Sequence, residues 1–138
     1  MQSLLAILSL VLFAWVPDHG PLTPTTAESR LVRDQLEAVA QALSSGDAEG
    51  LSEHFDAVVE LTLPGVNDIL PRERAESVLS DFFAKQAPHS FARVHGGLSG
   101  GDQGNYVIGE LRCSDATFRV FLYAGGDAGT RIQELRIE

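Results

Sequence analysis

Apolar residues recur every three or four positions along residues 25–45, which predicts a first helix there. They form one stripe, made of Val32, Leu36, Val39 and Leu43. The opposite side carries charged residues, Arg33 and Glu37 among them, and we interpret it as solvated surface.

A Gly-Asp pair separates this helix from the next. Gly46 suits the left-handed conformation that often ends a helix, and Asp47 can cap a short second helix over residues 48–55. Apolar and other residues then alternate over 57–63, which predicts the first strand.

A third helix is predicted from Pro71 to about Gln86, after a loop over residues 65–70. Proline fits the first turn of a helix, and Glu73 favours the positive end of the helix dipole. Apolar residues then keep the helical period up to the pair Phe82-Phe83.

The last third of the chain alternates between strand-like segments and short turns rich in glycine or polar residues. The four predicted strands cover residues 89–95, 105–113, 116–124 and 130–138. Short connections imply antiparallel pairing, and the strand at 57–63 joins this sheet after a helical crossover. We therefore predict an α+β fold, with three helices packed on a curved, mainly antiparallel sheet.

Alternation assigns the strand residues to two faces. The face towards the helices should carry Val59, Leu61, Leu63, Val107, Leu111, Cys113, Phe118, Val120, Leu122, Leu135 and Ile137. It contains no ionisable residue apart from the thiol of Cys113, the only cysteine of the chain. We interpret Cys113 as a small core residue, with a reactive thiol as the alternative.

The opposite face should mix arginine, glutamate and aromatic side chains. Its predicted members are Glu60, Thr62, Arg93, His95, Tyr106, Ile108, Glu110, Arg112, Arg119, Phe121, Tyr123, Ile132, Glu134 and Arg136. Three interpretations stay open: a solvated face with cross-strand ion pairs, a homodimer face, and a ligand platform of aromatic and arginine residues. The candidates for a dimer contact are Ile108, Phe121, Tyr123 and Ile132.

An uncharged run of thirteen residues extends from Leu4 to Val16. It is shorter than the roughly 20 residues of a membrane span and has the length of a signal-peptide core. We expect residues 1–27 to comprise a signal peptide, or else an uncleaved membrane anchor, together with a linker rich in proline and glycine. Residues 28–138 would then form one exported domain, periplasmic or secreted.

Composition narrows the range of partners. Asp and Glu number 19 against 10 Lys and Arg, and this acidic balance argues against a nucleic-acid partner. The four histidines have no metal-ligand spacing, so we expect neither a metal nor a cofactor.

Candidate chemistry is sparse. His54 and Asp56 could act together as a general base near the mouth of a pocket, with Glu60 close by, but we favour a capping or surface role for them. A second set, His95 with Glu60 or Glu110, falls on the outer face and favours a salt-bridged surface.

Two segments carry a resemblance to a known family: ALSSGDAEGLSEHFDAVVELTLPG (Ala42 to Gly65) and AESVLSDFFAKQAPHSFARVHGG (Ala75 to Gly97). Their plan resembles the nuclear transport factor 2-like (NTF2-like) fold. Within it the chain is similar to the DUF4783 family of small exported bacterial proteins. The likeness includes the FF pair, the Ser-Phe that opens the next strand, and the final LRIE (Leu135 to Glu138).

The resemblance implies an NTF2-like domain and no established activity. Combined with the apolar inner face, it favours a non-catalytic module of the bacterial envelope that binds a small ligand or a protein. The alternative is a small-molecule lyase or isomerase that uses an acid-base residue in the pocket.

Overall fold

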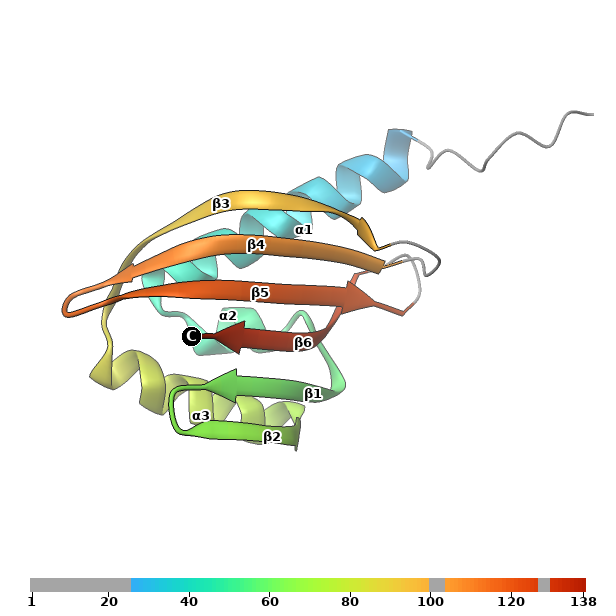
Figure 1. The fold of residues 1–138 in the computed structure, drawn as a ribbon. Coiled ribbons are helices and arrows are strands. Elements are labelled where there is room, and N and C mark those ends of the chain that lie inside the picture. Colours follow the sequence, from blue (N-terminus) through green and yellow to red (C-terminus); the bar gives the residue numbers. More distant parts are fainter. Residues whose placement is uncertain (1–25, 100–103, 127–129) are drawn as a thin grey trace, which may run out of the picture.

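The computed structural model describes residues 26–99, 104–126 and 130–138. Helices α1 (Thr26–Ser45), α2 (Ala48–Ser52) and α3 (Arg72–Lys85) lie on one side of a six-stranded sheet (Figure 1). The strands are β1 (Phe55–Leu63), β2 (Val66–Pro71), β3 (Pro88–Ser99), β4 (Gly104–Cys113), β5 (Thr117–Gly125) and β6 (Arg131–Ile137).

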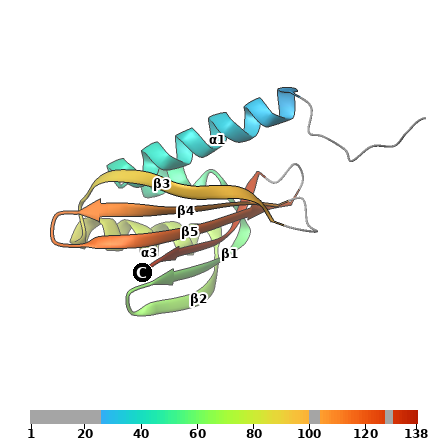
Figure 2. The ribbon, with the colours of Figure 1, turned by 45° about the horizontal axis from the view of Figure 1, so that its top comes forward.

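The sheet has the order β2-β1-β6-β5-β4-β3, and β1 with β6 is its one parallel pair among the described strands. The α+β architecture predicted from the sequence is confirmed. The sheet curves so that α1 lies along β3 while α3 covers β1 and β2 (Figure 2).

The apolar core fills the space between the helices and the sheet. Of the eleven residues assigned to the inner face, nine are buried, and the other two, Cys113 and Phe118, are partly buried against the core. Leu43, Leu51 and Leu79 bring the three helices into the same core. Alternation therefore predicted the core correctly.

The loop predicted at residues 65–70 is wrong. Residues 66–71 form β2, which pairs antiparallel with β1 from Leu63↔Val66 to Val58↔Pro71. Pro64 and Gly65 make a two-residue hairpin turn, and Gly65 adopts a positive φ of 84°. Polar residues and a terminal proline are typical of an edge strand, which explains why β2 lacks a clear apolar alternation.

The second helix is shorter than predicted. It ends at Ser52, and Phe55 begins β1 instead of closing the helix. The backbone N–H of Ile132 donates to the carbonyl oxygen of His54 over 2.8 Å, so pairing with β6 begins directly after the helix. Phe55 nevertheless enters the core, where it is fully buried.

Two irregularities reverse the sides predicted for two residues. In β6, Tyr123 pairs with Glu134 while Ala124 pairs with Ile132, so one additional residue turns Ile132 into the core, where it is 1% exposed. In β3, Arg93 pairs with Gly109 while His95 pairs with Ile108. Arg93 therefore lies on the helix side, and placing it and Ile132 on the outer face was wrong.

Candidate functional site

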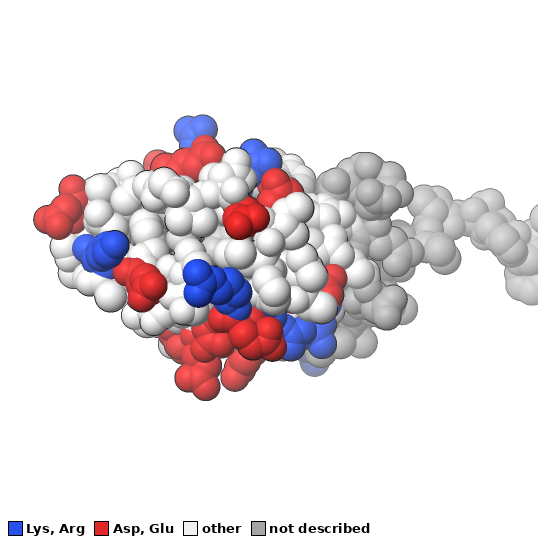
Figure 3. All heavy atoms as spheres, turned by 90° about the horizontal axis from the view of Figure 1, so that it is seen from below, with Lys and Arg blue, Asp and Glu red and all other residues white. Residues whose placement is uncertain are grey.

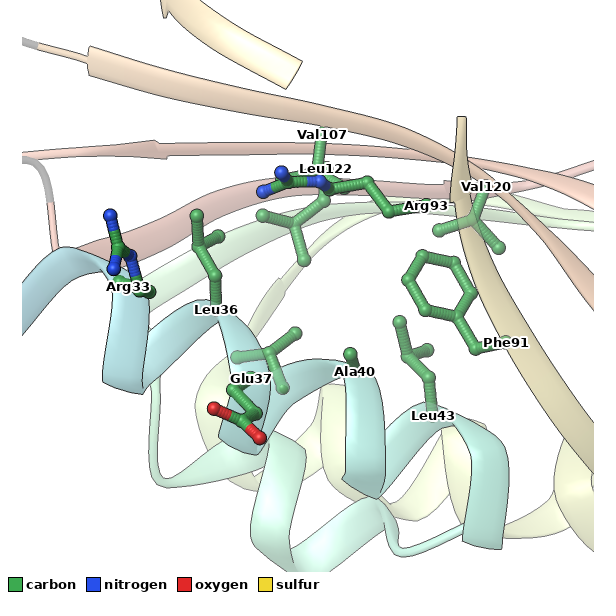
Figure 4. Close-up of a pocket in the computed structure, with 11 residues that line it drawn as sticks. Arg33, Leu36, Glu37, Ala40, Leu43, Phe91, Arg93, Val107, Val120 and Leu122 are labelled. Carbon is green, nitrogen blue, oxygen red and sulfur yellow. The ribbon is translucent and has the colours of Figure 1, made fainter. Parts of the chain in front are cut away.

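A pocket of about 210 Å³ lies between α1 and the strands β3, β4 and β5 (Figure 4). Its lining residues are Arg33, Leu36, Glu37, Val39, Ala40, Leu43, Phe91, Arg93, Val107, Val120 and Leu122. All but three of these are apolar. The volume lies between the roughly 150 Å³ of a cavity that binds benzene and the roughly 300 Å³ at which pockets for drug-sized ligands begin.

Small residues shape both sides of this space. Ala40 is the smallest side chain that α1 presents to the pocket. On β4, Gly109 lies between the inward residues Val107 and Leu111. A Cβ atom at Gly109 would lie 2.5 Å from the Phe91 ring and 2.6 Å from the Ala92 carbonyl oxygen. The ring of Phe91 therefore lies over a bare stretch of backbone and forms part of the pocket wall.

The packing closes beyond the pocket. A second space between α1 and the sheet, near Val39, Leu122 and Ile132, holds only about 10 Å³. That is at the lower limit of the volume that admits one water molecule. Between α1 and the sheet, a ligand therefore has room in the first pocket but not in this second space.

The polar groups lie at the rim. Arg33, Glu37 and Arg93 are all exposed. Figure 4 shows the guanidinium groups of Arg33 and Arg93 on the sheet side of α1, and the carboxylate of Glu37 pointing away from the sheet. Among the side chains that the structure describes, neither arginine forms an ion pair or a hydrogen bond.

The predicted acid-base residues lie elsewhere. His54 follows α2 and is half-buried, and burial lowers its pKa from the ordinary 6.5. Asp56 accepts hydrogen bonds from the backbone N–H of Ala57 (2.8 Å) and from Nε2 of Gln133 (3.1 Å), which lower its pKa. Glu60 pairs across strands with Ile69 and Glu134 on the outer face. None of the three lines the pocket, and no hydrogen bond joins His54 to either carboxylate in the described part of the chain.

The second histidine set is not assembled either. Nε2 of His95 lies 2.8 Å from the hydroxyl of Tyr106, and no ion pair joins it to Glu60 or Glu110 in the residues described. The outer face also carries an ion pair between Arg136 and Glu134 (2.5 Å), and Arg136 lies 5.9 Å from the centre of the Phe121 ring. These contacts fit the interpretation of a solvated face with short-range pairs.

The dimer candidates differ in exposure. Ile108, Phe121 and Tyr123 are partly buried on the outer face, whereas Ile132 belongs to the core. Three of the four candidates therefore remain on that face.

Cys113 is partly buried, and burial raises the pKa of its thiol, which keeps it protonated at neutral pH. A partly buried, protonated thiol agrees with the interpretation of Cys113 as a small core residue. In the described parts of the chain, no group of three His, Cys, Asp or Glu residues is placed to hold a metal ion.

Sequence reasoning placed six of the eleven described lining residues on inward faces and missed the charged rim. Arg33 and Glu37 were interpreted as solvated surface, and Arg93 was assigned to the wrong face. One signal was present in the sequence: Gly109 interrupts an otherwise strand-forming run, and such glycines mark a close approach to the backbone.

A layer of helices on a curved sheet, with an apolar pocket between them, defines the chain as an NTF2-like α+β protein. The protein Rd1NTF2_04 with long sheet has a similar fold, at a TM-score of 0.63 and 15% identity over 78% of this chain and 99% of that chain. A Bacillus subtilis protein provisionally assigned as an isomerase gives a TM-score of 0.61 at 13% identity, over 80% and 86% of the two chains.

The family follows from a closer match. The family model of the domain of unknown function DUF4783 matches residues 36–138, and the chain belongs to this family. A DUF4783 protein from Bacteroides uniformis is 25% identical, with a TM-score of 0.68, over 74% of this chain and 94% of that chain. No curated protein matches the sequence.

Residues 1–25 of the predicted leader lie outside the described residues, whereas Thr26 and Ala27 begin α1. Within the described ranges, no helix is long and apolar enough to cross a membrane.

Proposed function

We propose that this DUF4783 protein is a non-catalytic binding module of the bacterial envelope, which holds a small apolar ligand between α1 and the sheet. The observation that carries the proposal is the pocket of about 210 Å³ with a wholly apolar interior. Apolar pockets with a few polar groups at one side are the usual form of small-molecule sites.

The absence of an acid-base group among the described interior residues favours binding over catalysis. General acid-base chemistry needs an ionisable side chain within hydrogen-bond reach of the reacting atom. The carboxylate among the described lining residues, that of Glu37, sits at the rim and points away from the sheet. The likeness to the Bacillus subtilis protein is one of fold, and a shared fold does not by itself imply a shared activity.

The pocket predicts a ligand with an apolar body of limited size. A series of primary alcohols from butanol to decanol tests this by calorimetric titration of the full-length chain. Each buried methylene contributes about 0.8 kcal/mol, so the affinity should rise about fourfold per carbon and then level off when the pocket is full. Burial of apolar surface should also give a negative heat-capacity change.

Two results would contradict the proposal. One is the absence of saturable binding across the series. The other is an affinity that keeps rising to decanol without a plateau, because that is the behaviour of an open surface and not of a closed pocket.

Export is a separate part of the proposal, supported by the apolar run from Leu4 to Val16. Cell fractionation followed by mass spectrometry of the mature N-terminus tests it. Recovery of the intact chain in the cytoplasmic fraction would overturn it.

A further inference from the structure

Arg33 and Arg93 project from opposite walls of the pocket, one from α1 and one from β3, and both belong to its lining. Arg93 reaches this position because the irregularity after it in β3 leaves it on the helix side, opposite Gly109. Both guanidinium groups lie on the sheet side of α1 (Figure 4), and the other described lining residues apart from Glu37 are apolar.

Both arginines lack an ionic partner in the described part of the chain. A guanidinium presents five donors in a planar fork that matches a carboxylate. Glu37, four residues after Arg33, is the third charged rim residue, and its carboxylate is turned away. Two arginines and one glutamate leave one net positive charge at the mouth.

The positive charge of this rim is opposite in sign to the net charge of the chain. The formal net charge of the chain is −9. Seen from the side of α3 and β2, acidic side chains gather along one edge, and basic side chains are scattered (Figure 3). A net positive rim on an acidic protein is the arrangement that a monoanionic head group would need.

We propose that the pocket binds small amphiphilic carboxylates, with the apolar body between α1 and the sheet and the carboxylate between Arg33 and Arg93. The body is on the order of one aromatic ring or a short alkyl chain, because the volume of about 210 Å³ only moderately exceeds that of a cavity that holds benzene. This inference rests on the proposed function and adds the chemical class of the ligand.

The test compares octanoate with octanamide, which have the same chain and nearly the same head-group shape but differ in charge. In the full-length chain at low ionic strength, we expect octanoate to bind about tenfold more tightly, and the preference to shrink with added salt. The quantity to follow is the dissociation constant of octanamide divided by that of octanoate, because this ratio cancels changes in the apolar contribution.

Variants should move this ratio in opposite directions. Arg33→Gln together with Arg93→Gln should bring it to within about twofold of one. Glu37→Gln should raise it severalfold, since it removes the negative rim charge. The matched control, Arg74→Gln with Arg112→Gln, removes two exposed arginines that do not line the pocket and should keep the ratio. Thermal melts check that each variant is folded.

The outcomes separate the two proposals. Equal affinity for octanoate and octanamide, or a preference that survives removal of both rim arginines, would overturn the carboxylate assignment and leave the apolar pocket supported. Absence of saturable binding for both ligands would overturn the proposed function itself, and the carboxylate assignment with it.

Discussion

Filling the pocket with a side chain of the protein itself is the most direct test of its existence. Ala40 lies on the α1 wall, and a phenyl ring placed there by Ala40→Phe would project into a space of about 210 Å³. The same substitution at Ala38, which is exposed on the same helix and does not line the pocket, is the matched control.

The magnitude follows from two opposing contributions. Full burial of a phenylalanine side chain stabilises a fold by about 1.5–3 kcal/mol relative to exposure. Replacement of alanine costs about 0.5 kcal/mol in helix propensity. The ring should therefore increase the free energy of unfolding by about 1–2.5 kcal/mol at position 40. For a domain of this size that raises the melting midpoint by roughly 3–10 °C.

Ala38→Phe should have the opposite sign. Its ring stays in solvent and keeps only the propensity cost, so the midpoint should fall slightly. Calorimetry or circular dichroism gives both midpoints, and titration with octanol gives the affinities. We expect Ala40→Phe to weaken octanol binding by at least tenfold, and Ala38→Phe to bind as the unchanged chain does.

Two results would refute the reasoning. A midpoint lowered by Ala40→Phe would show that the space is already filled, because forcing a ring into a packed core costs about 1–3 kcal/mol. Full octanol affinity in a stable Ala40→Phe protein would show that the ligand binds elsewhere.

Three further predictions concern the rest of the molecule. Ile132→Ala should lower the free energy of unfolding by about 2–5 kcal/mol in urea titration, because the side chain is buried. The control Ile108→Ala, on the outer face, should lower it clearly less. Equal small effects would contradict the inward position of Ile132. The pKa of His54 is lower in the folded protein than its ordinary 6.5, so the unfolded chain binds more protons near and below pH 6.5. The free energy of unfolding should therefore fall as the pH drops from about 7 to 5, and His54→Gln should flatten this dependence. An unchanged slope in the variant would exclude His54 as its source. Sedimentation at high micromolar concentration should give a monomer, because Ile132 is absent from the outer face and Arg136 lies near the Phe121 ring; a dimer that Tyr123→Glu disperses would favour the homodimer interpretation instead.

The fold was largely predictable from the sequence, because its elements depend on local patterns. Apolar periodicity, Gly46 with Asp47, and Pro71 mark the helices, and alternation identifies nine buried residues of the inner face. β2 escaped prediction because an edge strand needs no apolar alternation, and because Pro64-Gly65 is typical of a turn whether a strand or a loop follows.

The candidate site was much less predictable, since it depends on what the elements leave open between them. Ala40 is a small residue, and only the packed structure shows that a space remains open beside it, whereas the ring of Phe91 covers Gly109. His54, Asp56 and Glu60 are close in the sequence, but the start of β1 directly after α2 separates a half-buried histidine from carboxylates that belong to the outer face.

Two strand irregularities decide the chemistry of both faces of the sheet. The one in β6 withdraws Ile132 from the outer face and buries it, which makes that face less apolar. The one in β3 keeps Arg93 on the helix side, where regular alternation from His95 would have placed it outside. A single additional residue in each strand thus removes an apolar group from the candidate interface and supplies a charge to the pocket mouth. Since alternation alone cannot locate such a residue, the arginine rim becomes visible only once the register of β3 against β4 is known.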